Sequence, residues 1–402
     1  MFEPGDRVFM PGAAGEPKAI AASVLASAGI DLWTTFVPGV NRIDPDAIGP
    51  GTNIRGLFGH RNVLSKRPEA FSAVPMSYGA FLRFVREGDP FDAVVVQVAP
   101  PDEGGFCSLG PLVEFSELAL NRAKRRIAVI NPEVRPMANG PRIRAADCEM
   151  IDGGKKPLPT YGGEPDPVSR RIAAHVVQFI DDGSALQMGL GKVPPALATE
   201  LVSRRRLRLH SGMLSDGVIA LHAAGALDSR WPHRTTALLG SNRLYDWAAN
   251  CDHLYIVGAD GIHDARVLAG IDRLIAVNSA LSVDLAGQCN LEVAGGVAVS
   301  GPGGAPDFAR AAALSPGGCS IVALPATLEN GESRIVIAFP AGVPSSLSRA
   351  DVDIVVTEEG AADLRGKSPA ERASALIAIA APAVREDLER AWRLQTFQGE
   401  QM

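Results

Sequence analysis

The sequence lacks paired cysteines and any spacing typical of metal ligands. Its five cysteines are odd in number and far apart, at positions 107, 148, 251, 289 and 319, and its histidines are equally dispersed. Zinc sites and disulfide frameworks both need such residues at close, regular spacing. We therefore expect no metal site, and free thiols that mostly fill small core positions in a reducing compartment.

The sequence also lacks a long apolar run and a marked excess of one charge. No stretch of about 18 apolar residues occurs, so no membrane-spanning helix is predicted. The opening residues Met1–Asp6 show no basic segment followed by an apolar core, so we expect no secretory signal and a cytoplasmic location. The net charge is −6 and basic residues are scattered, which argues against a general nucleic-acid binder.

Apolar residues are plentiful, at 46% of the 402 residues. This length predicts two domains and allows three. Several apolar runs are short, continuous and bounded by Gly, Pro, Asn or acidic residues, which is typical of strands buried on both faces of a parallel sheet. These runs are Ala93–Val98, Ile127–Ile130, Leu254–Val257, Leu274–Val277, Ile321–Leu324, Ile335–Phe339 and Val352–Val356.

Helical patterns lie between many of these strands. Apolar residues recur every four positions from Val168 to Ile180, which predicts one buried helical stripe. Ser368 and Glu371 have capping-box spacing with Pro369 at the first helical position, and a further helix is expected after Pro382. Strands that alternate with helices predict an α/β fold with open, mostly parallel sheets.

The segment from Asp152 to Pro167 is dense in Gly and Pro, so it continues neither a helix nor a central strand. It is the best candidate for a linker, and we place a domain boundary near Gly163. The predicted domains are residues 1–163 and 164–402, each an α/β unit.

Glycine-rich turns stand out after Val8-Phe9, after Val98, at Gly189-Leu190-Gly191, at Gly301–Gly304 and after Val356. Such turns let a ligand approach the backbone and point amides at anions, and in open α/β sheets ligands bind at the carboxyl ends of strands. Each turn alone is better explained as an ordinary tight turn, because Gly and Pro punctuate every α/β fold. Pro194 replaces the third glycine of a dinucleotide fingerprint and no Walker P-loop occurs, so no nucleotide cofactor is expected.

Taken together, the motifs resemble those of the acetyl-CoA hydrolase/CoA-transferase family, which includes 4-hydroxybutyrate and acetate CoA-transferases. The resemblance extends from about Asp6 to Trp392. It rests on seven runs in matching order: GDRVFMPGAAGEP (5–17), VQVAPPDEGGFCSLG (96–110), DDGSALQMGLGKVPPAL (181–197), LHSGMLSDGVIAL (209–221), VNSALSVDLAGQCN (277–290), SGPGGAPDFAR (300–310) and VTEEGAADLRGKSPAERA (356–373). It implies two α/β domains with the active site between them, usually in a homodimer, acting on an acyl-CoA and a small carboxylic acid.

In that family a glutamate attacks the acyl-CoA carbonyl, and a glutamyl-CoA thioester forms as an intermediate. The glutamate normally follows His-Thr, in a segment like His-Thr-Glu-Met-Phe-Ser-Asp-Gly. Here His210-Ser211-Gly212-Met213-Leu214-Ser215-Asp216-Gly217 places Gly212 at the nucleophile's position. Since glycine has no side chain, the usual covalent route is absent there.

Other family positions are matched. Asn278 matches an asparagine beside the catalytic glutamate; it would bind a thioester oxygen or a water, or alternatively satisfy strand-end backbone. Glu358 matches a glutamate near the site and is a candidate general base, or an ordinary turn residue. His210 is a second candidate base because it lies beside Gly212, although a lone histidine is more often a packed residue. The resemblance places CoA-binding turns at Gly189, Gly191, Gly301, Gly303 and Gly304.

These observations predict an enzyme that acts on a CoA thioester, by hydrolysis or by acyl transfer without an intermediate at position 212. Two alternatives stay open. One is a CoA-transferase whose carboxylate nucleophile has moved, for example to Glu358 or Glu359. The other is a catalytically silent CoA-binding or partner protein.

Overall fold

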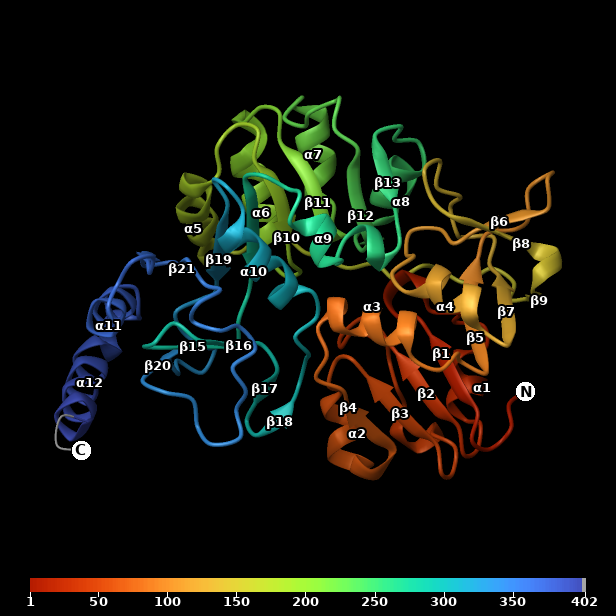
Figure 1. Cartoon of the computed structure of the whole chain (residues 1–402), viewed down its shortest axis with the longest axis horizontal. Helices are drawn as coiled ribbons and strands as arrows, with labels where there is room; N and C mark the ends of the chain where they lie inside the picture. Colours follow the sequence, from red (N-terminus) through yellow and green to blue (C-terminus); the bar gives the residue numbers. More distant parts are fainter. Residues whose placement is uncertain (400–402) are drawn as a thin grey trace.

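The computed structural model describes residues 1–399 and contains two large sheets that lie side by side (Figure 1). The first sheet has seven parallel strands in the order β4-β3-β2-β1-β5-β7-β9. Its strands are β1 Arg7–Met10, β2 Asp31–Thr34, β3 Asn53–Gly56, β4 Phe71–Ala73, β5 Ala93–Val98, β7 Arg125–Ile130 and β9 Glu149–Asp152. The α-helices between them are α1 Ala21–Leu25, α2 Arg61–Lys66, α3 Tyr78–Glu87 and α4 Ser116–Arg122.

The second sheet has the same plan, in the order β13-β12-β11-β10-β14-β19-β21-β22, and only its edge strand β22 is antiparallel. Its strands are β10 Ala185–Met188, β11 Arg208–Leu214, β12 His233–Leu238, β13 Leu254–Ile256, β14 Leu274–Asn278, β19 Cys319–Ala323, β21 Ile354–Thr357 and β22 Gly360–Asp363. Its α-helices are α5 Pro167–Val176, α6 Val193–Glu200, α7 Gly217–Ala223, α8 Asn242–Ala249, α9 Ala265–Leu268 and α10 Ala305–Leu314. The predicted fold class of mostly parallel α/β sheets is confirmed.

Smaller elements complete the described chain. They are the pair β6 Phe106–Ser108 and β8 Arg142–Arg144, the pair β17 Val293–Ala294 and β18 Val297–Ala298, the sheet of β15 Ser282–Asp284, β16 Cys289–Asn290 and β20 Ile335–Val336, and the helices α11 Pro369–Ala378 and α12 Arg385–Gly399. The helix predicted at Ser368 begins there with a complete capping box. The strand predicted at Ile335–Phe339 is wrong in length and place, because only Ile335–Val336 pairs, and it pairs with β15 rather than within the large sheet.

Continuous apolar runs form the central strands because both faces of each sheet are covered. All six residues of β5 and all five of β14 are buried. The largest cluster of buried apolar side chains contains residues of both large sheets, for example Val96 of β5 and Leu186 of β10. The boundary near Gly163 remains a prediction, since this core is continuous across it. Of the five free cysteines, only Cys148 is not fully buried, which agrees with their predicted role as core residues.

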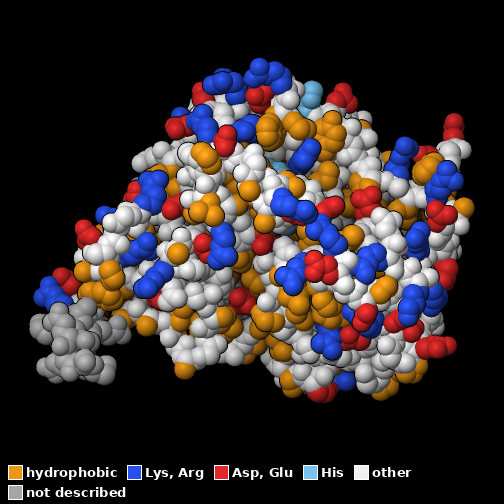
Figure 2. Space-filling view, viewed as in Figure 1, with side chains coloured by type: hydrophobic (Ala, Val, Ile, Leu, Met, Phe, Trp, Pro, Cys, Tyr) orange, Lys and Arg blue, Asp and Glu red, His pale blue; other side chains and the backbone are white. Residues whose placement is uncertain are grey.

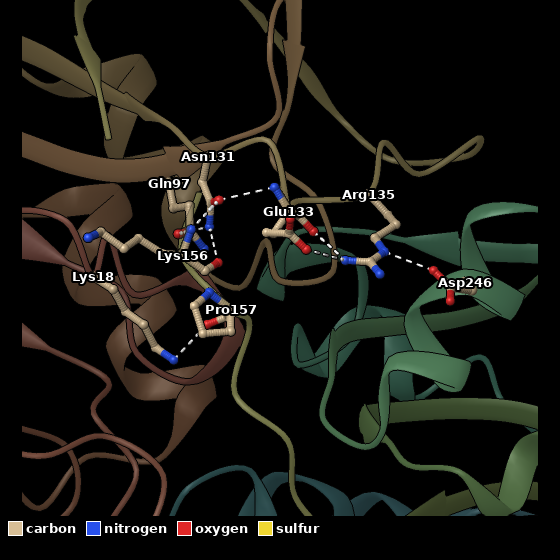
Figure 3. Close-up of polar contacts among 8 residues, drawn as sticks. All are labelled: Lys18, Gln97, Asn131, Glu133, Arg135, Lys156, Pro157 and Asp246. Carbon is tan, nitrogen blue, oxygen red and sulfur yellow. Dashed lines mark hydrogen bonds and ion pairs between the residues drawn. The ribbon is translucent and has the colours of Figure 1, made fainter. Parts of the chain in front are cut away.

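The Gly- and Pro-rich segment between β9 and α5 has no regular structure, as predicted, and is held against the first sheet (Figure 3). The Asn131 amide donates to the Lys156 carbonyl over 2.8 Å and accepts from the Lys156 amide over 3.0 Å. The Lys18 ammonium donates to the Pro157 carbonyl over 2.8 Å. An ion pair of 2.8 Å between Arg135 and Asp246 of α8 ties the two sheets' regions together.

On the face shown in Figure 2, basic and acidic side chains are interspersed where α3, α9 and α10 meet. Several form ion pairs there, including Arg86 with Asp264 at 3.3 Å and Arg310 with Asp351 at 3.0 Å. No helix among residues 1–399 is long and apolar enough to cross a membrane.

Candidate functional site

A cavity of about 340 Å³ lies at the carboxyl ends of the central strands of the second sheet. The strand order reverses direction between β10 and β14, and ligands in open α/β sheets bind at such a switch point. Met188 ends β10 and Asn278 ends β14, and both line the cavity. The polypeptide topology alone therefore marks this position as a ligand site.

The loop Gly301–Gly304 forms one wall and leads directly into α10. A Cβ atom on Gly301 would lie 1.8 Å from the Leu57 carbonyl oxygen, and Gly303 has φ of +55°. Position 301 therefore has no room for a side chain, and position 303 has a left-handed backbone that favours glycine. Because α10 begins at Ala305, the partial positive charge of its N-terminus lies at this wall, where it favours a developing negative charge.

Gly212 of β11 contributes the next part of the wall. Its carbonyl accepts a 2.6 Å hydrogen bond from the Thr236 hydroxyl. Its backbone is extended with no positive φ, so the chain path itself would tolerate a side chain. What a side chain would meet is the ring of His263, whose Nε2 lies 3.0 Å from the position of a Cβ atom.

Asn278 is buried at the end of β14. Its Oδ1 accepts a 3.2 Å hydrogen bond from the Gln187 side chain of β10. Its Nδ2 has no hydrogen-bond partner among the described residues. Since buried amide groups are almost always paired, this N–H group is available to an acceptor in the cavity.

The region of the first sheet supplies a second polar wall. The Tyr78 hydroxyl, at the start of α3, donates to Glu114 over 3.0 Å, and the Thr35 hydroxyl donates to the same carboxyl over 2.8 Å. Burial raises the pKa of Glu114 to about 7, although both hydrogen bonds oppose the shift. Tyr78 and Glu114 line the cavity together with Gly212, so the site is built from residues of both sheets' regions.

A second cavity of about 450 Å³ adjoins the first and shares Gly189, Asn278 and Arg334 with it. Gly191 and Glu358 line this second cavity. One oxygen of Glu358 accepts a 2.8 Å hydrogen bond from the Ala326 amide.

The structure thus brings together Gly189, Gly212, Asn278, Gly301, Gly303 and Gly304, while Gly191 and Glu358 stand in the adjoining cavity. His210 lines neither. It is buried behind the wall, its Nε2 lies 3.1 Å from the Ile262 carbonyl oxygen, and burial lowers its pKa to about 4.

Sequence reasoning missed Tyr78, Glu114, His263 and Arg334. None of them belongs to a glycine turn or a recognised spacing, and their contacts with the cavity come from distant parts of the chain. The only available signal was that His263 follows closely after the predicted strand Leu254–Val257. In the described part of the chain, no group of three His, Cys, Asp or Glu residues is placed to hold a metal ion.

Comparison with known proteins identifies relatives over nearly the whole chain. Residues 240–392 match the acetyl-CoA hydrolase/transferase C-terminal domain. The 4-hydroxybutyrate coenzyme A transferase of Clostridium kluyveri is 36% identical over 310 residues, which cover 74% of this chain and 72% of that protein. The succinyl-CoA:cyclohexane-1-carboxylate CoA transferase of Geobacter metallireducens is 30% identical over 404 residues, covering 97% and 92%. The crystal structure of 4-hydroxybutyrate CoA-transferase from Porphyromonas gingivalis superimposes with a TM-score of 0.79 at 28% identity, covering 98% and 94%.

Proposed function

Because this chain belongs to the acetyl-CoA hydrolase/transferase family, whose enzymes act on CoA thioesters, we propose that it cleaves the thioester bond of an acyl-CoA in the cavity beside Gly212. The observation that supports this site is the convergence of Gly212, Asn278 and the Gly301–Gly304 loop on one cavity.

Position 212 offers no carboxylate, so the acyl group is attacked directly, and water is the simplest nucleophile. Attack places a negative charge on the thioester oxygen. The free Nδ2 of Asn278 and the N-terminal end of α10 are the groups that would stabilise this charge. No glutamyl-CoA intermediate forms at position 212.

Thiol release from a panel of acyl-CoAs, with and without carboxylic acids, tests this function. Hydrolysis releases free CoA without any acceptor acid, whereas transfer requires the acid. CoA should also stabilise the fold by roughly 2.7 kcal/mol at a hundredfold excess over its dissociation constant. Stabilisation without thiol release would instead indicate a silent CoA-binding protein, and neither effect at millimolar CoA would refute the proposed function.

One observation favours a second candidate, a CoA-transferase with a displaced nucleophile. Glu358 lines the adjoining cavity, which shares Asn278 and Arg334 with the first. In this alternative, the Glu358 carboxylate attacks the thioester and later passes CoA to an acceptor acid. Treatment with borohydride or hydroxylamine during turnover, followed by mass spectrometry, would reveal a stoichiometric adduct on Glu358 or its neighbour Glu359.

We further propose a cytoplasmic homodimer. The homodimer is what the family resemblance implies, and five free thiols are compatible with a reducing compartment. Light scattering of the purified protein at micromolar concentration tests the assembly, and a monomeric mass would contradict it.

A further inference from the structure

His263 is a buried histidine whose ring nitrogens have no hydrogen-bond partner in the described structure. Its side chain is only 1% exposed. The other two buried histidines of the second sheet differ: His210 pairs with the Ile262 carbonyl, and Nδ1 of His233 accepts from the Leu209 amide. Because buried polar groups are nearly always satisfied, the two free nitrogens of His263 need an explanation.

The ring of His263 lies in a slot between two glycines. Its Nε2 is 3.0 Å from the position of a Cβ atom on Gly212, and its Cε1 is 2.3 Å from the position of one on Gly304. A side chain at either position would displace the imidazole. The two glycines therefore admit the ring to the wall of the cavity, and Nε2 is the ring atom nearer to Gly212.

Asp307 of α10 lies on the other side of the ring. One of its carboxylate oxygens, Oδ2, is 3.8 Å from Nδ1 of His263. The carboxylate is held in place by the Ser77 hydroxyl over 2.7 Å and the Gly79 amide over 2.8 Å. Catalytic hydrogen bonds are often long in the absence of substrate, and a shift of under about 1 Å would make this one.

We propose that His263, oriented by Asp307, is the general base that activates water for attack on the thioester at the position beside Gly212. This inference rests on the proposed function. Nε2 of the neutral imidazole takes a proton from the water, and the water oxygen forms a bond to the thioester carbon. The carbon–sulfur bond then breaks, and the imidazolium returns the proton to the leaving sulfur. The products are a carboxylic acid, which ionises in solution, and CoA as its free thiol.

The charges around the ring suit this role above about pH 6. Burial lowers the pKa of His263 to about 3, so the imidazole is neutral before reaction but only weakly basic, and it needs a nearby negative charge to accept a proton. Burial raises the pKa of Asp307 to about 6, so its carboxylate is ionised at neutral pH and would stabilise the imidazolium. The rate should therefore fall as the pH drops through about 6, where Asp307 is protonated and this stabilisation is lost.

Other titratable groups face the same region. Tyr78 contacts the ring edge-on with centroids 4.9 Å apart and donates to Glu114, while His210 approaches from β11 and Arg310 from α10 near Asp307. The pKa of Tyr78 lies well above its usual value, mainly because of burial, and that of His210 is about 4, so neither changes charge between pH 5 and 9. Besides Asp307, Glu114 titrates near neutrality, with a pKa of about 7.

The decisive variant is His263→Gln, assayed for thiol release from an acyl-CoA at pH 8 without acceptor acid. We expect kcat/KM to fall by about 10²- to 10⁴-fold. The thermal stabilisation by CoA should persist, because His263 contacts the reacting water rather than CoA. The matched control is His222→Gln, which replaces a histidine that contacts Trp247 and does not line the cavity, and it should leave the rate unchanged. In His263→Ala, free imidazole should restore part of the lost rate.

Wild-type rates in His263→Gln, or thiol release that strictly requires an acceptor acid, would overturn the role of His263. An acyl adduct on His263 would replace the general base with a nucleophile and also overturn it. If neither variant folds, the pH profile of Glu114→Gln decides, because the titration of Glu114 is removed in it: a rate that stays constant from pH 8 to pH 5 in this protein contradicts the Asp307–His263 pair. Wild-type protein that neither binds nor cleaves any acyl-CoA refutes the proposed function itself, whereas normal wild-type turnover with an unaffected variant refutes only this inference.

Discussion

Nε2 of His263 lies 3.0 Å from the point at which a side chain on Gly212 would begin. The absence of a side chain at Gly212 therefore leaves the space that the imidazole ring of His263 occupies. Gly212→Glu should destabilise the fold by about 1–3 kcal/mol, because the ring must move in a closely packed wall. Gly212→Ala should cost less, because a Cβ atom there requires a shift of only a few tenths of an ångström. In the His263→Ala background, whose own stability is the reference, either substitution at position 212 should cost much less. Urea unfolding of the single and double variants measures this coupling, and effects that simply add would show that the two positions are independent.

The double variant Gly212→Glu with His263→Ala tests whether the family's route through a glutamyl-CoA intermediate can be restored. With Gly212→Glu and His263→Ala together, a carboxylate has room at the family's nucleophile position. We expect thiol exchange that depends on an acceptor acid, and a CoA adduct at position 212 after borohydride treatment. His263→Ala alone is the control and should give no adduct.

The glycines of the 301–304 loop should respond to alanine in different degrees. Gly303→Ala places a side chain at φ +55°, close to Phe58, and should cost about 1 kcal/mol. Gly301→Ala and Gly304→Ala should cost more, since their Cβ atoms would collide with the Leu57 carbonyl and the His263 ring. Urea unfolding gives the order, and equal costs at the three sites would contradict it.

Removing the free amide of Asn278 should slow turnover. Asn278→Ala removes the one hydrogen-bond donor of β14 that we assign to the thioester oxygen. A donor of this kind is typically worth on the order of a hundredfold in kcat. CoA binding measured by thermal shift should stay close to wild type. A rate within threefold of wild type would leave the N-terminus of α10 as the sole source of charge stabilisation.

Glu114 should make stability depend on pH. Its pKa is raised from 4.5 to about 7 in the folded protein, so folding takes up a proton between these pH values. The contribution of the protonated carboxyl to the free energy of unfolding is complete below about pH 4.5. This contribution, on the order of 3 kcal/mol, is lost as the pH rises through 7. In Glu114→Gln, the uncharged amide removes that dependence, so the variant should gain stability over wild type at pH 8 but not at pH 4.5. Parallel stability curves for the two proteins would contradict the raised pKa.

Local sequence patterns predicted what depends on local structure. The apolar run Ala93–Val98 forms β5 as predicted, and the Ser368 capping box starts α11, because burial on both faces and helix capping leave marks in neighbouring residues. The motif order likewise led to the family. Ile335–Phe339 has the same apolar character, but tertiary context leaves only two residues of it in a strand.

The less predictable part of the site comes from distant segments. His263 gains its position from a 2.6 Å hydrogen bond between its backbone amide and the Ala259 carbonyl, and from the two glycines that make space for its ring. Glu114 reaches the cavity because its segment pairs with residues near Gly258 in the other sheet's region. Neither relationship leaves a pattern in adjacent residues, since each joins segments of the chain that are far apart in sequence.

The first sheet also reverses its strand order, between β1 and β5. The linker that follows β9 is bound beside the carboxyl end of β7, the neighbour of β5 in that sheet. Asn131 follows the end of β7 and donates to the Gln97 side chain of β5, and Asn131 and Lys18 bind the backbone of Lys156 and Pro157 (Figure 3). The linker is thus a tethered ligand, whose effective concentration is on the order of millimolar or higher. A free molecule would have to displace the linker to use these hydrogen-bonding groups, whereas the switch point between β10 and β14 opens onto the cavity beside Gly212.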